Sequence, residues 1–337
     1  MAMEIPKADI WEQTVFAVNY YANFSETALA VFRFQYQNNE LYQRFCQALG
    51  KTPQQVQQIT DIPFLPISFF KSGPVCTTKF APQLIFESSG TTGAVVSRHY
   101  VKDAALYEKS FLKTFEQFYG PVHDYCIIGL LPSYLERSHS SLVYMVHHLI
   151  QRSQHPLSSF YLHDFDGLAA ALQKLEKAKQ KTLLIGVTYA LLDFAAAYPM
   201  PLHHTIVMET GGMKGRKKEM VRSEVHSTLQ AAFSLPHIHS EYGMTELLSQ
   251  AYAYDDGRFQ TPPWMKVLIR DEDDPLQLTV QTVKPVTGGI NVIDLANIYS
   301  CSFIAVEDVG RLHPDNSFEV LGRMDNTDIR GCSLLSL

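Results

Sequence analysis

Between residues 83 and 264, short apolar runs alternate with amphipathic stretches along the chain. Short apolar runs rich in β-branched residues are typical of buried strands, and apolar positions three or four residues apart are typical of helices. The pattern predicts strands at 83–86, 95–101, 125–131, 182–186, 205–208 and 237–239, and helices at 103–118, 138–152, 187–197 and 217–232. Such alternation is typical of parallel sheets that are covered by helices.

The two ends of the chain follow other patterns. Residues 8–49 contain no Gly or Pro, which predicts two helices, and an irregular passage follows up to about residue 80. After residue 264 we expect only short strands, at 267–270, 276–283, 302–306 and 318–321. The sequence therefore predicts an α/β fold, with parallel or mixed sheets sandwiched by helices and a β-rich C-terminal portion. We expect one core at 1–321, of which 1–80 is a helical and irregular lead-in, and a short tail at 322–337.

Composition narrows the classes of function. The chain has 337 residues, of which 46% are hydrophobic and 18% charged, so it can bury a large core. A net charge of −6 argues against general nucleic-acid binding. The start of the chain lacks an apolar signal segment, and the most apolar long stretch, 183–200, is interrupted by Asp193 and is too short to favour a membrane span. Five scattered cysteines without zinc spacing fit a reducing compartment, so we expect a cytoplasmic protein.

One loop suggests phosphate chemistry. Glu87 opens the segment Glu-Ser-Ser-Gly-Thr-Thr-Gly directly after an apolar run. Glycines let several backbone N–H groups point at one anion, and serine and threonine add hydroxyl donors. The residues of this phosphate loop are Ser88, Ser89, Gly90, Thr91, Thr92 and Gly93. No Gly-Lys-Ser/Thr follows, so the loop is not of the Walker type, and an isolated cluster of this composition is also typical of a simple turn.

Further segments in the same order along the chain strengthen that interpretation. They are 240–246 (Ser-Glu-Tyr-Gly-Met-Thr-Glu), 306–311 (Val-Glu-Asp-Val-Gly-Arg) and 321–325 (Leu-Gly-Arg-Met-Asp), together with 63–71, 140–145, 209–215 and 330–334. With these motifs the chain resembles the adenylate-forming (acyl-activating) superfamily and, within it, the acyl-protein synthetases of bacterial bioluminescence, the LuxE type. The resemblance covers nearly the whole chain from about residue 60.

The resemblance implies roles for single residues in binding ATP and Mg²⁺. It implies that the phosphate loop holds the β- and γ-phosphates, that Tyr242 stacks on adenine and that Thr245 bonds the α-phosphate. It implies further that Glu246 binds Mg²⁺, that Asp308 holds the ribose hydroxyls, and that Arg323 reaches ribose or phosphate oxygens. The remaining residues assigned to the nucleotide site are Gly211, Gly212, Glu241 and Gly243. Taken singly, Glu246 could instead be a carboxylate in the first turn of a helix, Asp308 a turn residue and Arg323 a surface charge.

The chain also departs from the wider superfamily. The sequence ends fourteen residues after Arg323, so we expect the mobile C-terminal lid domain and its catalytic lysine to be absent. Adenylyl transfer needs positive charge near the reacting oxygens, for which Lys214 and Arg98 are the candidates beside Mg²⁺. Each of them could also be an ordinary surface residue.

Cys332 lies near the end of the chain, where the LuxE-type resemblance implies an acyl-accepting cysteine. A thiolate attacks an acyl adenylate well, and the thioester keeps the acyl group reactive. A buried structural cysteine is the alternative for this residue.

We expect ATP-dependent activation of a carboxylic acid, and specifically a fatty acid, to acyl-AMP. We expect the acyl group to pass to Cys332 and then to a protein partner such as an acyl reductase. Two alternatives stay open at this point: a phenylacetate-type acyl- or aryl-CoA ligase, and a non-catalytic protein that binds a nucleotide or an acyl group.

Overall fold

The computed structural model describes residues 8–18, 23–88, 95–132, 138–211 and 220–324. The chain divides into two compact units, one made of residues 1–69 and 263–337 and the other of residues 70–262. Among the described residues, no helix combines the length and the apolar character that a membrane span requires. The assignment of 1–321 to a single core stays a prediction.

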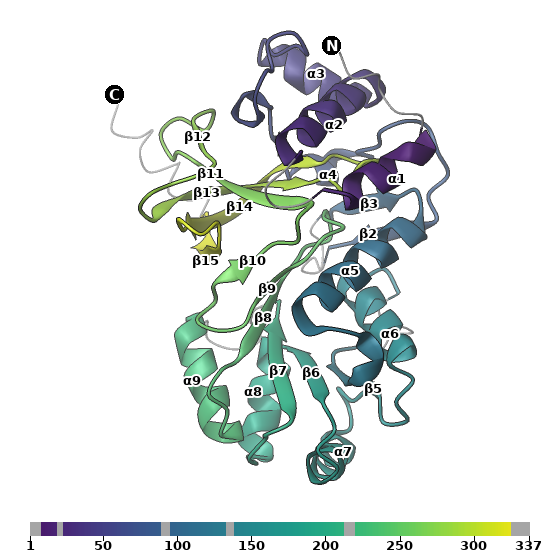
Figure 1. The fold of residues 1–337 in the computed structure, drawn as a ribbon, viewed down its shortest axis with the longest axis vertical. Helices are drawn as coiled ribbons and strands as arrows, with labels where there is room; N and C mark the ends of the chain where they lie inside the picture. Colours follow the sequence, from purple (N-terminus) through teal and green to yellow (C-terminus); the bar gives the residue numbers. More distant parts are fainter. Residues whose placement is uncertain (1–7, 19–22, 89–94, 133–137, 212–219, 325–337) are drawn as a thin grey trace. The chain divides into compact units, whose positions relative to one another are not determined.

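The central unit, residues 70–262, contains a mostly parallel sheet (Figure 1). Its strands follow the order β5-β4-β6-β7-β8-β9-β10, in which β4 to β8 run parallel and β9 and β10 are antiparallel additions. These strands are β4 (Cys126–Leu130), β5 (Ser159–Phe160), β6 (Thr182–Val187), β7 (Thr205–Thr210), β8 (His239–Tyr242), β9 (Ala251–Ala253) and β10 (Phe259–Gln260). Strands β4 and β6 are buried along their whole length, as expected for the middle of a parallel sheet with helices on both faces.

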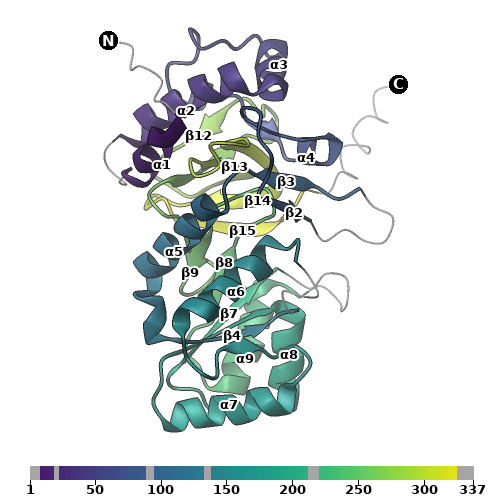
Figure 2. The same cartoon turned by 90° about the vertical axis from the view of Figure 1, so that its right-hand side faces the viewer.

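Helices cover both faces of this sheet. Helices α8 and α9 lie on one face, and α5 and α6 lie on the other (Figure 1 and Figure 2). The helices of the unit are α4 (Phe69–Ser72, which starts at the boundary), α5 (Ala104–Tyr119), η2 (Val122–Asp124), α6 (Ser141–Ser153), α7 (Phe165–Lys177), α8 (Thr188–Ala197) and α9 (Arg222–Phe233). Helix α5 begins where the sequence predicts it, because the Asp103 side chain accepts a hydrogen bond from the Ala105 N–H at 3.0 Å.

A separate antiparallel hairpin precedes α5. It is formed by β2 (Leu84–Glu87) and β3 (Arg98–Val101), with Glu87 opposite Arg98. The predicted phosphate loop lies in the sequence between these two strands.

The other unit combines N-terminal helices with an antiparallel sheet. The helices are α1 (Ala8–Phe16), α2 (Phe24–Asn38), α3 (Glu40–Ala48) and η1 (Ile59–Asp61). The strands follow the order β12-β11-β13-β14-β15, with β1 parallel to β14. They are β1 (Leu65–Pro66), β11 (Met265–Arg270), β12 (Leu278–Thr279), β13 (Val286–Asp294), β14 (Phe303–Leu312) and β15 (Phe318–Arg323).

A buried glutamine attaches α2 to the strands of this unit. The Gln35 Nε2 donates to the carbonyl oxygens of Asn297 and Ile298 at 3.1 and 3.0 Å, and its Oε1 accepts from the Ser302 N–H at 3.0 Å. Both ends of the buried amide are therefore satisfied, which offsets the cost of removing it from water.

The predicted α/β fold with a β-rich C-terminal portion is confirmed, with several local differences. Residues 8–49 form three helices instead of two, since the chain breaks around residue 39 as well as before residue 24. Helix α7 was not predicted. Strand β13 was also missed, because Gly288 and Gly289 are typical of a turn; here they lie in the strand, and a Cβ at Gly289 would overlap the Arg270 side chain.

Candidate functional site

The predicted site residues of the central unit gather at the carboxyl ends of its parallel strands. Thr210 ends β7 and pairs with Glu241, and Tyr242 ends β8. Gly211 follows β7 with φ of +75°, a left-handed conformation that favours glycine. Ligands of open α/β sheets bind outside this edge, so the fold places Glu241, Tyr242 and Gly243 where a ligand is expected.

Glu241 is a buried carboxylic acid at this edge. The Thr210 Oγ1 donates a hydrogen bond to Glu241 Oε2 at 2.5 Å. Burial raises the pKa of Glu241 to about 7, and the nearby charge of Glu209 acts in the same direction. Near neutral pH this group therefore exchanges between its protonated and ionised forms.

Glu209, on the neighbouring strand, has a different environment. Its Oε1 lies 3.3 Å from Arg222 Nε and 3.7 Å from His226 Nε2, and its Oε2 accepts from Thr188 Oγ1 at 3.1 Å. Burial alone would raise the pKa of Glu209, but the interactions with His226 and Arg222 outweigh burial and lower it. Glu209 is therefore the ionised member of the two buried carboxyl groups.

Tyr242 lies on the other face of β8 from Glu241. Its ring centroid is 5.7 Å from that of Phe259 on β10, and the Arg222 guanidinium carbon lies 5.1 Å from the Phe259 centroid. An aromatic ring held between strands in this way is a rigid platform for a flat ligand.

Ser88, the first residue of the phosphate loop, is joined to Ser97 by two hydrogen bonds. The Ser88 N–H donates to the Ser97 carbonyl at 3.1 Å, and the Ser97 N–H donates to Ser88 Oγ at 2.9 Å. Ser88 therefore has a structural role at the base of the loop in addition to the ligand role predicted for it.

His99 connects this hairpin to the loop that follows β8. Its Nδ1 lies 2.8 Å from the Thr245 carbonyl oxygen, its ring packs edge-on against Phe70, and it is buried. The contact places Thr245 beside the β2–β3 hairpin, and Glu246 is the next residue in sequence. Glu246 is only 4% exposed, which is unusual for a glutamate and argues against a simple surface carboxylate.

Asp308 and Arg323, in the other unit, lie on adjacent strands. They are register partners in β14 and β15, and Arg323 Nε lies 3.7 Å from Asp308 Oδ1. The Arg323 side chain is largely exposed whereas that of Asp308 is largely covered. The structure thus brings together two residues that are fifteen positions apart in sequence, and their proposed contacts with a nucleotide stay predictions.

The other predicted site residues are either exposed at the surface or outside the described part of the chain. Arg98 is more than half exposed and pairs with Glu87 at 2.9 Å across the hairpin, an ion pair typical of a protein surface. Several candidates lie outside the described residues: Ser89, Gly90, Thr91, Thr92, Gly93, Gly212, Lys214 and Cys332.

Two residues that contact Glu209 were missed in the sequence. Arg222 and His226 are four positions apart on α9, which places both on one face of a helix that the pattern predicts. That spacing was the available signal, but nothing local in the sequence shows that the face meets the end of β7.

No preformed metal cluster of three or more His, Cys, Asp or Glu side chains occurs among the described residues. A Mg²⁺ that accompanies ATP is usually held by one or two carboxylates together with phosphate oxygens, so the single carboxylate of Glu246 fits that mode of binding.

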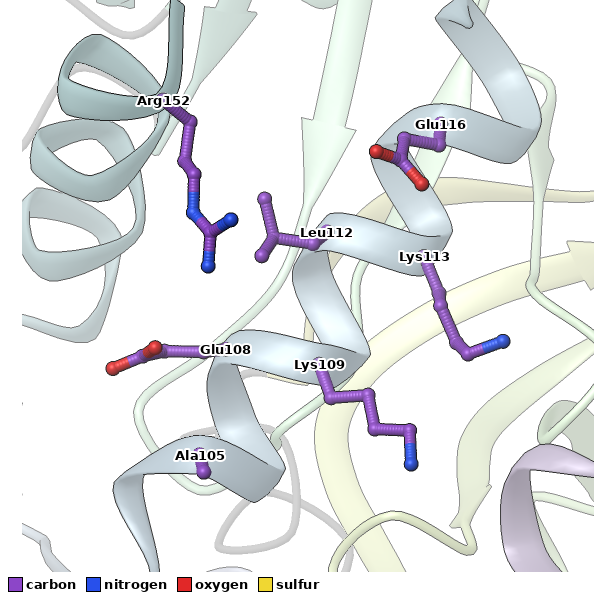
Figure 3. Close-up of a pocket in the computed structure, with 7 residues that line it drawn as sticks. All are labelled: Ala105, Glu108, Lys109, Leu112, Lys113, Glu116 and Arg152. Atoms are coloured by element: carbon purple, nitrogen blue, oxygen red, sulfur yellow. The ribbon is translucent and has the colours of Figure 1, made fainter. Parts of the chain in front are cut away.

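A surface pocket of about 350 Å³ lies elsewhere, over α5 and the end of α6 (Figure 3). Six of its lining residues belong to α5, and Arg152 comes from α6. Its lining is mostly charged: Glu108, Lys109, Lys113, Glu116 and Arg152. None of the predicted site residues lines it, so it is not the candidate site.

Sequence comparisons relate the chain to a known family. The model of the family "Acyl-protein synthetase, LuxE" matches residues 19–336. A long-chain-fatty-acid–luciferin-component ligase of Vibrio harveyi is 21% identical over 336 residues, which cover 92% of this chain and 86% of the relative.

Solved structures show more distant likeness. They include a luciferase-like enzyme from the mealworm Zophobas morio (13% identity, TM-score 0.49, 74% of this chain) and a long-chain-fatty-acid-CoA ligase from Archaeoglobus fulgidus (13% identity, TM-score 0.48, 74% of this chain). The matched regions span 60% and 53% of those two chains.

Proposed function

Because the chain belongs to the LuxE family of acyl-protein synthetases, we propose that it activates a long-chain fatty acid with ATP to form acyl-AMP and pyrophosphate. The acyl group then passes to a cysteine of the enzyme and from there to an acceptor protein. The Vibrio harveyi relative is named as a ligase of a long-chain fatty acid and a luciferin component. That name supports the proposed substrate and the proposed protein acceptor.

One observation carries the proposal for ATP: the contact between His99 and the Thr245 carbonyl. It holds the hairpin that carries the phosphate loop against the segment that carries Thr245 and Glu246. A loop rich in N–H and hydroxyl donors beside a buried carboxylate is suited to bind phosphates together with a divalent cation. Neither part alone would indicate a nucleotide.

Each residue then has a distinct task in this proposal. The phosphate loop binds the β- and γ-phosphates, Thr245 donates to the α-phosphate, and Tyr242 supports the adenine ring. Glu246 holds Mg²⁺, which would neutralise charge on the phosphate oxygens. Lys214 and Arg98 stay candidates for additional positive charge, and Asp308 and Arg323 for binding the ribose.

The described cysteines support Cys332 as the acyl acceptor by being poor nucleophiles. Burial raises the pKa of the Cys46 thiol to about 12 and that of Cys126 to about 11, and it also raises the pKa of Cys76 and Cys301. A thiol attacks as its thiolate, so these four groups are almost entirely in the unreactive form at neutral pH. Of the five cysteines in the sequence, only Cys332 is not described by the structure.

In the transfer step, the sulfur of the Cys332 thiolate attacks the carbonyl carbon of acyl-AMP. A C–S bond forms, the bond between that carbon and the phosphate oxygen breaks, and AMP leaves with the electron pair. The thiol proton is released to solvent when the thiolate forms. The product is a thioester, which can be handed to an acceptor protein.

The first test is pyrophosphate exchange into ATP, measured over a panel of fatty acids. We expect exchange that depends on the acid, and a loss of roughly 100-fold or more for Glu246→Gln, which keeps the size of the side chain but removes the charge. Exchange that is absent for every acid would contradict the proposal and favour a binding protein.

The second test locates the acceptor. Incubation with ATP and radiolabelled fatty acid should label the protein through a bond that hydroxylamine cleaves, and Cys332→Ser should abolish this labelling while leaving exchange intact. Cys76→Ser is the matched control and should label normally. If labelling requires Cys76, or if free CoA is acylated instead, the acceptor assignment is wrong.

A further inference from the structure

Arg222 contacts three separate segments from the first turn of α9. Its Nε lies 3.3 Å from Glu209 Oε1 at the end of β7, and its guanidinium carbon lies 5.1 Å from the centre of the Phe259 ring on β10. Its side chain also lies close to Gly257, in the turn between β9 and β10. One side chain therefore joins the helix to a strand end, to a turn and to an aromatic ring.

The strand register places these contacts on the face of the sheet that carries Tyr242. Glu209 pairs with Ser240, and alternate residues of a strand share a face, so the side chains of Ser240 and Tyr242 lie on the same face as that of Glu209. His226 Nε2, on α9, lies 3.7 Å from Glu209 Oε1 and 3.3 Å from Ser240 Oγ. Helix α9 therefore packs on the face that carries the Tyr242 ring (Figure 1).

Phe259 connects Arg222 with Tyr242. Phe259 is 1% exposed, and its ring centre lies 5.7 Å from that of Tyr242. A cation over an aromatic ring is attracted by the π electrons, and the attraction grows when the pair is shielded from water; the Arg222 side chain is 31% exposed. Because buried rings are closely packed, a shift of Phe259 moves the ring that packs against it.

The contacts of Arg222 go beyond the neutralisation of Glu209. A Cβ built on Gly257 would lie 2.8 Å from Arg222 Cδ and 2.9 Å from its Nη1, so the side chain fills the space that this glycine leaves. An ion pair with Glu209 alone requires neither this close approach nor the position over Phe259. The two additional contacts hold the guanidinium in one place.

We propose that Arg222 is a positioning residue for the nucleotide, which fixes the Phe259 ring and through it the Tyr242 ring that supports the adenine. This role rests on the proposed function, which assigns the adenine to Tyr242. Arg222 itself touches no substrate. Its displacement should weaken the binding of ATP, and it should leave the binding of inorganic tripolyphosphate unchanged because that ion has no base.

Gly257→Ala tests this role without removing Arg222, because the added methyl group displaces the guanidinium. The Kd of ATP, measured by calorimetry with Mg²⁺ present, should rise roughly 3-fold to 10-fold, and the Kd of tripolyphosphate should not change. Gly50→Ala is the matched control. Gly50 has the same φ of +65°, and hence the same backbone strain, but no atom lies within 4 Å of its Cβ position. This control should bind ATP as the wild type does.

A double-mutant cycle shows whether Arg222 acts through Phe259. Arg222→Met and Phe259→Leu should each raise the Kd of ATP roughly 3-fold to 10-fold, and the double variant should add no more than about 2-fold, because the second change removes a contact that is already lost. Arg222→Lys keeps a cation near the ring and should restore most of the affinity. Lys181→Met, which removes a cation 5.8 Å from the Tyr125 ring, is the control. The unfolding temperature of each variant shows that it is folded during the measurement.

Three outcomes would overturn the proposal. They are equal ATP binding by Gly257→Ala and Gly50→Ala, effects of Arg222→Met and Phe259→Leu that multiply in the double variant, and a parallel loss of tripolyphosphate binding. The last would mean that the loss does not concern the base.

Tyr242→Leu separates these outcomes from a failure of the proposed function. This variant should raise the Kd of ATP roughly 10-fold. If its affinity is unchanged, or if the wild type binds no ATP, the adenine site of the proposed function is wrong. If Tyr242→Leu weakens ATP binding while the Arg222 and Gly257 variants bind normally, the adenine site stands and only the positioning role is refuted.

Discussion

Two buried carboxyl groups on neighbouring strands of the same sheet have opposite properties. Glu209 on β7 has a guanidinium, an imidazole and a hydroxyl around it, and its pKa is lowered. Glu241 on β8 receives a hydrogen bond from Thr210, and its pKa is raised to about 7. Both lie near the carboxyl end of a parallel strand, but the strand register places their side chains on opposite faces of the sheet.

The difference shows which of the two carboxyl groups the protein pairs with a cation. Helix α9 supplies Arg222 and His226 to Glu209, so that carboxylate is neutralised within the protein and stabilises the packing of α9 on the sheet. Glu241 faces α5, which offers it no cation among the described contacts, and its neighbour Gln250 has an unused acceptor. We therefore infer a structural role for Glu209, whereas the role of Glu241 in binding a ligand stays a prediction.

The largest effect is expected from removing Arg222, the cation that pairs with Glu209. Arg222→Met keeps most of the aliphatic length but leaves a buried charge with weaker compensation, and should lower the free energy of unfolding by about 3–5 kcal/mol. Urea denaturation measures the loss. Arg98→Met, which breaks the exposed pair with Glu87, is the control and should cost less than about 1 kcal/mol. Equal losses for the two variants would refute the structural role of Glu209.

The second effect is a pH-dependent change in the free energy of unfolding, on the order of 3 kcal/mol, that comes from Glu241. The raised pKa means that the folded state holds a proton that the unfolded state releases, so this contribution to stability is complete below about pH 4.5 and is lost as pH rises through about 7. Glu241→Gln should not show this loss of stability. Its free energy of unfolding should therefore rise relative to that of the wild type as pH increases from about 4.5 to 7. Urea unfolding at a series of pH values measures the difference.

The variant must be compared with the wild type because the contribution of His239 to stability depends on pH in the opposite direction. Burial lowers the pKa of His239 to about 4, so its contribution is lost as pH falls below about 6.5, in both proteins alike. Glu209→Gln provides the contrast: because the pKa of Glu209 is lowered, its stabilisation is lost only as pH falls below about 4.5. A Glu241→Gln difference that is flat between pH 4.5 and 7 would show that Glu241 is ionised throughout.

The smallest effect tests the turn that follows Glu209 and Thr210. Gly211 has φ of +75°, where an L side chain is strained, so Gly211→Ala should cost about 1 kcal/mol of stability. Gly73→Ala is the control, because Gly73 has no left-handed φ and no atom within 4 Å of its Cβ position. Thermal unfolding measures both. Equal costs at the two positions would mean that the turn adapts to a side chain.

Local sequence patterns were sufficient for much of the fold and for the family. The apolar run at 182–186 became the fully buried β6, and the Asp103 cap began α5 where the pattern places it. Motif order along the chain was sufficient to place it among the LuxE acyl-protein synthetases, and the family match confirms this resemblance. These signals work because strand burial, helix capping and loop chemistry depend on residues within a few positions of one another.

Only the tertiary structure decided which polar groups satisfy one another. The bonds of Glu209 to Arg222 and Thr188, the contact of His99 with Thr245 and the unsatisfied oxygen of Gln250 join or isolate residues from different elements. The residue types alone could not show that the pKa of Glu209 is lowered whereas that of Glu241 is raised to about 7. The pKa of a buried group depends on the charges and donors that packing brings within a few ångströms, and those neighbours lie far away along the chain.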